Sequence, residues 1–441
     1  MNLIPQLIFV LILGVFTFLI YRRVARIKAN ILLGRSADYS DQSTARWKTM
    51  GLVAFGQKKM FKRWVPATLH FMIYAGFILI NLEVLEIILD GLLGTHRLFA
   101  AFMGGFYTFL ISFFEILAVL VLVSCVVFLI RRNILKLDRF HKIEMKGWPA
   151  LDANLILIIE IALMVAILKM NAADQVLQSR GVPHYTQTGS FLISSMLVPF
   201  FQSYSDNMLL VAERAAWWLH IVGIFAFALY VTYSKHLHIF MAFPNTYYSR
   251  LEPKGKMDNM PEITNEVKMM LGVPVEGDPA PPAEGMKFGA KDVNDLTWKN
   301  LMDAYACTEC GRCTSECPAN ITGKSLSPRK IMMDTRDRAE EVGANAGSTD
   351  DGKSLLGDYI TKEEINACTT CNACVEACPV NISPVEIILQ LRRYVAMEES
   401  GAPASWNSMF SNVETNFAPW KFAPTDRFKW ADEMLDKNSG E

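Results

Sequence analysis

Two short runs contain eight of the nine cysteines in this 441-residue chain. The first reads CTECGRCTSECP over residues 307–318, and the second reads CTTCNACVEACP over residues 368–379. In each run three cysteines are two residues apart, and a fourth follows after three residues and precedes a proline. Thiolates with this spacing ligate [4Fe–4S] clusters, and the fourth cysteine of each run reaches the other cluster. The runs therefore predict two neighbouring clusters that pass single electrons.

The crossed spacing divides the eight cysteines into two ligand sets. The first set is expected to hold one cluster and consists of Cys307, Cys310, Cys313 and Cys378. The second set is expected to hold the other cluster and consists of Cys368, Cys371, Cys374 and Cys317. Zinc sites are the alternative, but they use CxxC pairs with wider gaps. The ninth cysteine, Cys125, lies in an apolar segment and is expected to be a packed small side chain.

Five apolar segments precede the cysteine runs and must carry them. They cover residues 3–20, 65–89, 101–130, 152–170 and 207–241. Each can cross about 30 Å of hydrocarbon as a helix. The first is followed by positive charges and by no small-residue cleavage site, which predicts an uncleaved anchor with its N-terminus outside. Strand patterns are nearly absent elsewhere, so the predicted fold class is all-α.

The positive charges predict the orientation of these segments. Residues 21–64 contain eleven Lys and Arg and residues 131–149 contain six, whereas residues 90–100 and 171–206 contain one each. Cytoplasmic loops carry the excess of Lys and Arg, so the first two loops and, after five spans, the cysteine runs are expected in the cytoplasm. The predicted location is the inner (cytoplasmic) membrane. The lipid bilayer explains the basic residues, and no nucleic acid is expected as a partner.

Histidines in the apolar segments suggest haem. His220 and His238 are 18 residues apart, which in one helix is five turns and about 27 Å, so both would project from one face. This spacing predicts axial ligands for two stacked b-type haems, one near each side of the membrane. His70, at the cytoplasmic start of the second segment, is expected to pair with His238.

A second haem requires a partner for His220. His96, just before the third segment, is the candidate, and His184 is an alternative. One or two b haems are therefore expected. His141 and His236 are expected to make interfacial contacts.

Carboxylates in or near the apolar segments are costly to bury and usually face the interior of a bundle. They are Glu83, Glu86, Glu115 and Glu160. Two interpretations are open: a proton relay to a quinone, or neutral hydrogen-bonded groups. The grouping of Glu83 and Glu86 with Arg97 predicts a pocket for menaquinone or ubiquinone near the outer face. No sequence pattern for a nucleophile or a nucleotide-binding loop accompanies them, so the catalytic residues stay unassigned.

These features predict four segments. Residues 1–244 form a transmembrane haem b domain, and residues 245–295 form a linker that includes VEGDPAPPAEG. Residues 296–400 form a helical domain with two [4Fe–4S] clusters. Residues 401–441 form a tail expected to dock a partner.

The membrane half resembles the gamma subunit of respiratory nitrate reductase, a cytochrome b, through its five spans, the His220/His238 spacing and His70. Ile80 stands where that family carries a further haem histidine. From LTWKNLMDAYACTECGRC onward, the chain resembles the ferredoxin part of heterodisulfide-reductase-like proteins. Relatives of this combined architecture include electron-transfer-flavoprotein:menaquinone oxidoreductases. The resemblance implies a split relative of these proteins that works with a separate cytoplasmic subunit carrying cysteine-rich CCG domains, or with an electron-transfer flavoprotein.

Three functions remain to be distinguished. The first is an oxidoreductase subunit that moves electrons between such a partner and the quinone pool. The second is a membrane polyferredoxin acting in assembly, metal reduction or redox sensing, which needs clusters but no haem histidines. The third is a scaffold that only anchors a partner, which needs neither. The donor, the direction of flow and the oligomeric state are not encoded in any pattern found.

Overall fold

The computed structural model describes residues 3–275 and 287–438, and these residues form helices joined by loops, with no strand among them. Only two isolated β-bridges occur there, Arg35 with Thr297 and Leu356 with Ile360. The all-α prediction is therefore confirmed. Most of the predicted stiff linker sequence, at residues 276–286, lies outside the described residues.

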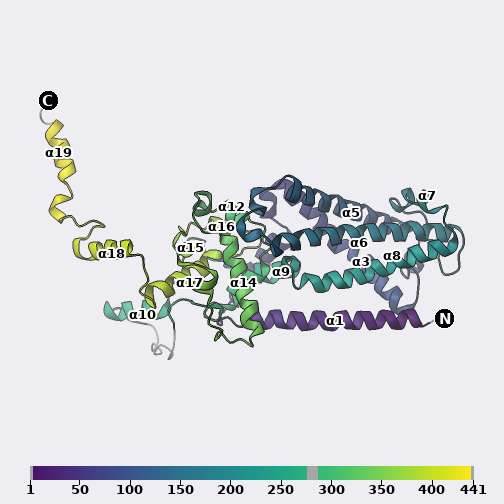
Figure 1. The fold of residues 1–441 in the computed structure, drawn as a ribbon, viewed down its shortest axis with the longest axis horizontal. Coiled ribbons are helices and arrows are strands. Elements are labelled where there is room, and N and C mark those ends of the chain that lie inside the picture. The colour runs from purple at the N-terminus through teal and green to yellow at the C-terminus, as the bar shows by residue number, and fades with distance from the viewer. Residues whose placement is uncertain (1–2, 276–286, 439–441) are drawn as a thin grey trace. The chain divides into compact units, whose positions relative to one another are not determined.

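Five long apolar helices lie side by side (Figure 1). They are α1 Ile4–Ile31, α3 Trp64–Leu93, α5 Gly105–Leu129, α6 Trp148–Ser179 and α8 Asp206–Val231. All five are long and apolar enough to cross a membrane. Four of them cover the predicted apolar segments, and the fifth is shorter than its predicted segment.

Short elements connect the long helices. The short α-helices are α2 Ser43–Met50, α4 Ala100–Met103, α7 Val198–Phe201 and α9 His238–Tyr247. Single 3-10 or π turns cover Gly51–Phe55, Met60–Lys62, Ile130–Ile134, Asp138–Phe140, Ile143–Met145, Ser194–Met196 and Lys235–Leu237.

The bundle is apolar on both its inside and its outside. On α5, Tyr107 and Ile111 are buried in the core, whereas Phe106 and Phe109 are exposed on the outer surface. Large exposed apolar surfaces are unfavourable in water and mark contact with lipid or protein. This distribution fits a membrane protein whose outer side chains face hydrocarbon.

The last helix of the bundle breaks where an unbroken span was predicted. α8 ends at Val231, and α9 begins only at His238. The cause is Asp152 on α6, whose carboxylate accepts hydrogen bonds from Ser234 Oγ at 2.6 Å and from the Lys235 backbone N–H at 3.2 Å. These bonds hold the chain away from a helical path. The prediction of one continuous helix over 207–241 is wrong, and so is the same-face argument for His220 and His238 that depended on it.

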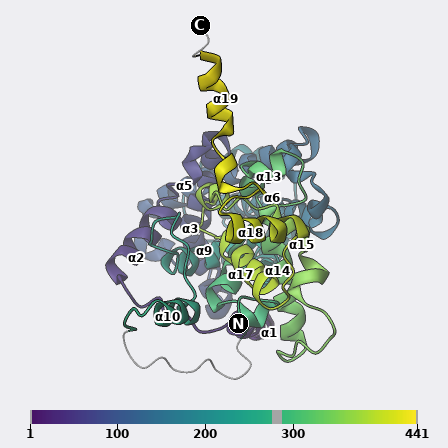
Figure 2. The ribbon, with the colours of Figure 1, turned by 90° about the vertical axis from the view of Figure 1, so that its left-hand side faces the viewer.

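The cysteine runs belong to a cap of short helices at the end of the bundle opposite the N-terminus (Figure 1). Its helices are α11 Trp298–Ala306, α12 Arg312–Ser315, α13 Pro318–Ile321, α14 Pro328–Ala344, α15 Lys362–Asn366 and α16 Ala373–Ala377, with turns at Val293–Asp295 and Leu355–Tyr359. Viewed from that end, α14 and α15 lie in front of the bundle helices (Figure 2). Thr297 and Thr361 begin α11 and α15 with capping boxes, which satisfy exposed backbone N–H groups.

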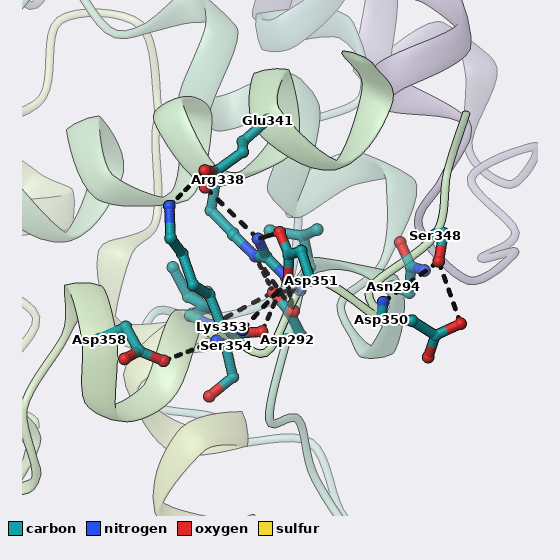
Figure 3. A network of polar contacts seen from close by, with 12 residues as sticks. Asp292, Asn294, Arg338, Glu341, Ser348, Asp350, Asp351, Lys353, Ser354 and Asp358 are labelled. Carbon is teal, nitrogen blue, oxygen red and sulfur yellow. Dashed lines mark hydrogen bonds and ion pairs between the residues drawn. The ribbon is translucent and has the colours of Figure 1, made fainter. Parts of the chain in front are cut away.

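A buried arginine organises the segment between the two cysteine runs (Figure 3). Arg338 on α14 has no exposed surface and pairs with Asp292 at 2.7 Å and with Asp351 at 2.5 Å. Its Nη2 also donates to the Lys353 carbonyl at 2.9 Å. Removing one partner of a buried ion pair costs about 3–5 kcal/mol, so this network fixes the loop after α14 against the start of the cap.

Bundle and cap form one compact unit, residues 1–258 and 292–387, and the rest forms a second unit, residues 259–291 and 388–441. The described part of the second unit contains α10 Pro261–Met270, most of α17 Pro384–Met397, α18 Ala404–Asn416, a 3-10 turn at Pro424–Asp426 and α19 Lys429–Asn438. The four predicted segment boundaries stay predictions.

Candidate redox sites

The two cysteine runs adopt the same loop. In the first run Glu309 and Gly311, on either side of Cys310, have positive φ of 54° and 71°. In the second run Thr370 and Asn372, on either side of Cys371, have positive φ of 54° and 59°. Left-handed residues on both sides of one cysteine turn the chain tightly, so cysteines close in sequence face a common centre. Non-glycine residues in this region are uncommon, and their repetition in both runs points to a shared ligand-holding geometry.

The structure places the fourth cysteine of each run with the other run. The pKa of the Cys307 thiol is raised to about 12, mainly by burial and also by the neighbouring Cys310 and Cys378. Burial likewise raises the pKa of the Cys374 thiol to about 12, and its neighbours include Cys368 and Cys317.

Both sets fit a [4Fe–4S] cluster in the chemistry of their donors. A small cavity is lined by all four cysteines of the first set and also by Cys374 of the second set. Backbone N–H groups point at the sulfurs, from Ile382 to Cys378 Sγ and from Thr370 to Cys368 Sγ, both at 3.3 Å. Such bonds stabilise thiolate charge. Among the described residues, no three His, Cys, Asp or Glu side chains group as a single metal ion would require.

His70 and His238 lie close together, as axial haem ligands would. Their ring centroids are 6.2 Å apart. A metal–imidazole bond is about 2 Å, so two imidazoles on one iron place their centroids roughly 6 Å apart. Nδ1 of His70 lies 3.2 Å from Gln57 Oε1, and Nδ1 of His238 lies 3.2 Å from the Lys235 carbonyl oxygen. Both acceptors need an N–H, so Nε2 of each ring keeps its lone pair for a metal.

His220 shows the same arrangement. Its Nδ1 lies 3.1 Å from the Leu163 carbonyl oxygen, and its buried Nε2 has no hydrogen-bond partner. The ring lines a cavity of about 80 Å³ together with Ile80, Glu160 and Met164.

His96, the predicted partner of His220, is engaged elsewhere. Its Nε2 lies 3.0 Å from Asp174 Oδ1, and its ring neighbours are His184 and Tyr185, at 5.7 and 4.9 Å between centroids. His96 and His220 line different cavities. The structure does not bring this pair together, and the pairing stays a prediction.

The other histidines and Cys125 are accounted for by packing. Nε2 of His141 lies 3.1 Å from the Arg132 carbonyl oxygen. His236 is half-buried and contacts the rings of Phe227 and His238, and its interfacial role stays a prediction. Cys125 is fully buried in the bundle core.

One lysine joins the histidine pair to the first cysteine run. The backbone carbonyl of Lys235 accepts from His238, while its buried side chain forms an ion pair with Glu309, between Cys307 and Cys310. Glu309 also pairs with Arg336 at 2.9 Å. The two charges lower the pKa of Glu309, although burial acts in the opposite direction. Lys235 and Glu309 therefore fix the loop carrying His238 against the loop carrying Cys310.

The grouping predicted around Glu83, Glu86 and Arg97 forms a cavity of about 570 Å³ at the N-terminal end of the bundle. Arg97 is buried, and it donates to Asp174 at 2.7 Å and to Asn171 at 2.8 Å. Glu86 accepts from the Tyr107 hydroxyl and from the Phe99 backbone N–H, both at 2.7 Å. Glu83 Oε1 has no hydrogen-bond partner although it is buried. The cavity thus combines apolar walls with a few convergent polar groups, as ligand sites do.

The other two intramembrane carboxylates differ from this grouping. Glu115 accepts from Asn171 at 3.0 Å and from the Ile193 backbone N–H at 2.8 Å, so it ties three segments together. Glu160 lines the same cavity as His220.

Sequence reasoning missed three residues of the large cavity. Asp174, Glu213 and Trp217 line it from the ends of α6 and α8. Glu213 is buried and accepts from the Tyr185 hydroxyl at 2.8 Å. Asp174 and Glu213 are carboxylates within long apolar helices. Such carboxylates usually face the interior of a bundle, so this rule alone would have identified both as candidate site residues.

Comparisons with known proteins agree with the cysteine geometry. Residues 306–382 match the family model of a 4Fe-4S dicluster domain. The chain is 30% identical to the probable iron-sulfur-binding oxidoreductase FadF of Bacillus subtilis, over 96% of this chain and 59% of the relative. It is 26% identical to the EtfAB:quinone oxidoreductase of Syntrophomonas wolfei, over 89% of this chain and 55% of the relative.

A third relative matches only part of the chain. It belongs to the dihydromethanophenazine:CoB–CoM heterodisulfide reductase of Methanosarcina acetivorans, and it is 30% identical over 32% of this chain and 35% of the relative. No solved structure matches. The chain spans less than two thirds of the length of its FadF and EtfAB:quinone oxidoreductase relatives. It is a membrane-helix protein with a 4Fe-4S dicluster domain, homologous to the FadF-like and EtfAB:quinone iron–sulfur oxidoreductases.

Proposed function

We propose that this chain moves electrons between a cytoplasmic redox partner and membrane quinone. The single observation that carries the proposal is the Lys235 connection between the His70/His238 pair and the first cysteine run. A ferredoxin domain held only for anchoring needs no buried ion pair between its ligand loop and a histidine loop of the bundle. The alternatives of an assembly factor, a metal reductase or a sensor have no such feature in their favour.

Each candidate site has a distinct role in this proposal. The two cysteine sets would hold [4Fe–4S] clusters, and the paired histidines would hold a b haem; when bound, these groups carry single electrons. His220 is a further candidate ligand, because its Nε2 is buried and unpartnered. The chain's own residues hold the ligands in place, keep Nδ1 of each histidine protonated and exclude water.

The large cavity is the proposed quinone site. Quinone oxygens accept hydrogen bonds, and Arg97 and His184 line the cavity as possible donors. Carboxylates such as Glu83 and Glu213 line it too and can exchange the protons that accompany quinol oxidation. Trp217 lies on the same helix as His220 and less than one turn away, so a bound quinone would be close to the next candidate ligand.

The partner and the sidedness follow as parts of the same proposal. The printed names of the relatives refer to electron-transfer flavoprotein and to heterodisulfide reductase, so we propose a soluble partner of the flavoprotein or iron–sulfur kind. The excess of Lys and Arg in the loops beside the cysteine cap supports a cytoplasmic location for the cap. Cys371 is the exposed member of its set, and the partner is expected to approach there.

Anaerobic reduction by quinol tests the proposal. The purified chain in nanodiscs should show haem reduction within seconds after a menaquinol analogue is added. Arg97→Gln should slow this step about tenfold or more, because a hydrogen bond from a charged group contributes about 1.5–3 kcal/mol. Dithionite reduction should remain complete, which shows that the haem is present.

Two further variants keep this test decisive. His184→Ala should also slow quinol reduction, since His184 lines the cavity without belonging to the Arg97 network. Arg180→Gln is the matched control, because Arg180 is a partly exposed arginine that pairs with Asp206. The proposal of quinone coupling would be refuted if dithionite reduced the haem but quinols with a potential lower than that of the haem left it oxidised.

A further inference from the structure

Three cations surround the first cysteine set and have no carboxylate partner among the described residues. They are Lys59, Arg139 and Arg312. The first two belong to the loops of the membrane half, and the third lies between Cys310 and Cys313 in the cap. Other cations nearby are neutralised: Arg329 pairs with Glu144 at 2.7 Å, and Arg63 pairs with Glu316 at 2.7 Å. The three cations therefore leave a net positive charge around the first cysteine set.

Lys59 and Arg312 are held by backbone carbonyls close to the cysteines, and Arg139 packs against the first cysteine loop. Lys59 Nζ donates to the carbonyl oxygens of Val375 and Cys378, both at 3.1 Å. Arg312 Nη1 donates to the Lys59 carbonyl at 3.3 Å. Arg139 lies against Gly311, where an added Cβ would meet its backbone oxygen at 3.3 Å, and its Nε is buried without a hydrogen-bond partner.

The second cysteine set has different surroundings. Cys371 itself is exposed. Glu376, which lies within this run, contacts both Lys62 and Lys254, which are partly exposed and screened by water.

We propose that Lys59, Arg139 and Arg312 hold the reduction potential of the cluster on Cys307, Cys310, Cys313 and Cys378 above that of the other cluster. A reduced cluster carries one more negative charge than an oxidised one, so fixed cations nearby stabilise the reduced form. The effect is large where water is excluded, because Coulomb interactions grow as the dielectric constant falls. Burial of a charged cluster acts the other way, and the proposal requires the three cations to outweigh it.

The consequence is a preferred direction of electron transfer between the two clusters of the cap. An electron arriving at the exposed set, near Cys371, would run downhill to the set beside the bundle. Two of the three cations come from the membrane half, so the docking of the cap on the bundle sets this order. The inference rests on the proposed function, since it requires both clusters to be bound.

Redox titration followed by EPR spectroscopy tests the inference on the full-length protein in detergent. Two cluster signals with separate midpoint potentials are expected. Arg139→Gln and Lys59→Gln should each lower the higher midpoint and leave the lower one in place. Lys142→Gln is the matched control, because Lys142 is an exposed cation in the same loop as Arg139, and it should shift neither.

The outcomes distinguish failure of the proposed order of potentials from failure of the proposed function. A shift of the lower midpoint, or no shift of either in the Arg139 and Lys59 variants, would overturn the proposed ordering while leaving two clusters in place. Absence of two [4Fe–4S] signals from the unaltered protein would instead count against the clusters themselves, and so against the proposed function. Iron content and circular dichroism of each variant distinguish a shifted potential from a protein that has not folded.

Discussion

The two ends of the bundle both bury histidines, but they commit different ring nitrogens. At the cap end, His70 and His238 use Nδ1 for a hydrogen bond and lie with their rings 6.2 Å apart, which leaves Nε2 of each for a metal. At the N-terminal end, His96 uses Nε2 to bind Asp174, and its Nδ1 is buried without a partner. The imidazole is the same in both places, and the group that it contacts decides which nitrogen a metal can reach. The cap end uses Nδ1 of two neighbouring histidines for hydrogen bonding, whereas the N-terminal end uses Nε2 of its histidine for hydrogen bonding beside a cavity.

Removal of the cap-end histidines is expected to have the largest effect. His70→Ala and His238→Ala should each abolish the same low-spin haem spectrum, because either loss leaves the iron with one axial ligand. His141→Ala is the control, since that ring bonds the Arg132 carbonyl through Nε2, and its haem content should equal that of the unaltered protein. Loss of two different haem signals from the two alanine variants would show that these rings do not share an iron.

The contrast between His220 and His96 provides the next test. His220→Ala should remove any second haem, because its Nε2 is buried and unpartnered. His96→Ala should leave every haem spectrum unchanged and slow quinol oxidation instead, since His96 lines the large cavity. Visible spectra at low temperature distinguish these outcomes. A matching loss of one haem from both variants would establish the His96/His220 pair and overturn the comparison between the two ends.

The smallest effect is expected at the group that orients His70. Gln57→Leu removes the acceptor of the His70 Nδ1–H and should weaken haem binding about tenfold, the lower end of the range for such supporting groups. Transfer of haem to a competing apoprotein measures how strongly each variant retains its haem. Gln42→Leu, in the same loop but exposed, is the control. Equal haem retention in the two variants would mean that Gln57 does not set the orientation of the ring.

Other features of the N-terminal end of the bundle were within reach of sequence reasoning but were not used. Asp174 and Glu213 follow the same rule that singled out Glu83 and Glu86, namely that a carboxylate in an apolar helix faces the interior. The grouping of Glu83, Glu86 and Arg97 was predicted from their proximity in the chain. Their arrangement around a cavity with Trp217 and Pro5 depends on α1, α3, α6 and α8 meeting at one end, which no local pattern states.

The sequence alone determined the properties that depend on local spacing. Apolar runs of sufficient length specify the membrane helices, and cysteines at intervals of two and three residues specify cluster ligands. Tertiary structure decided what depends on contacts between distant segments. The break after Val231 arises because Asp152 on another helix binds Ser234, and the approach of His238 to the first cysteine run arises because Lys235 pairs with Glu309. These partners are 74 or more residues apart, so helix periodicity carries no information about them, and only packing of the folded chain brings them together.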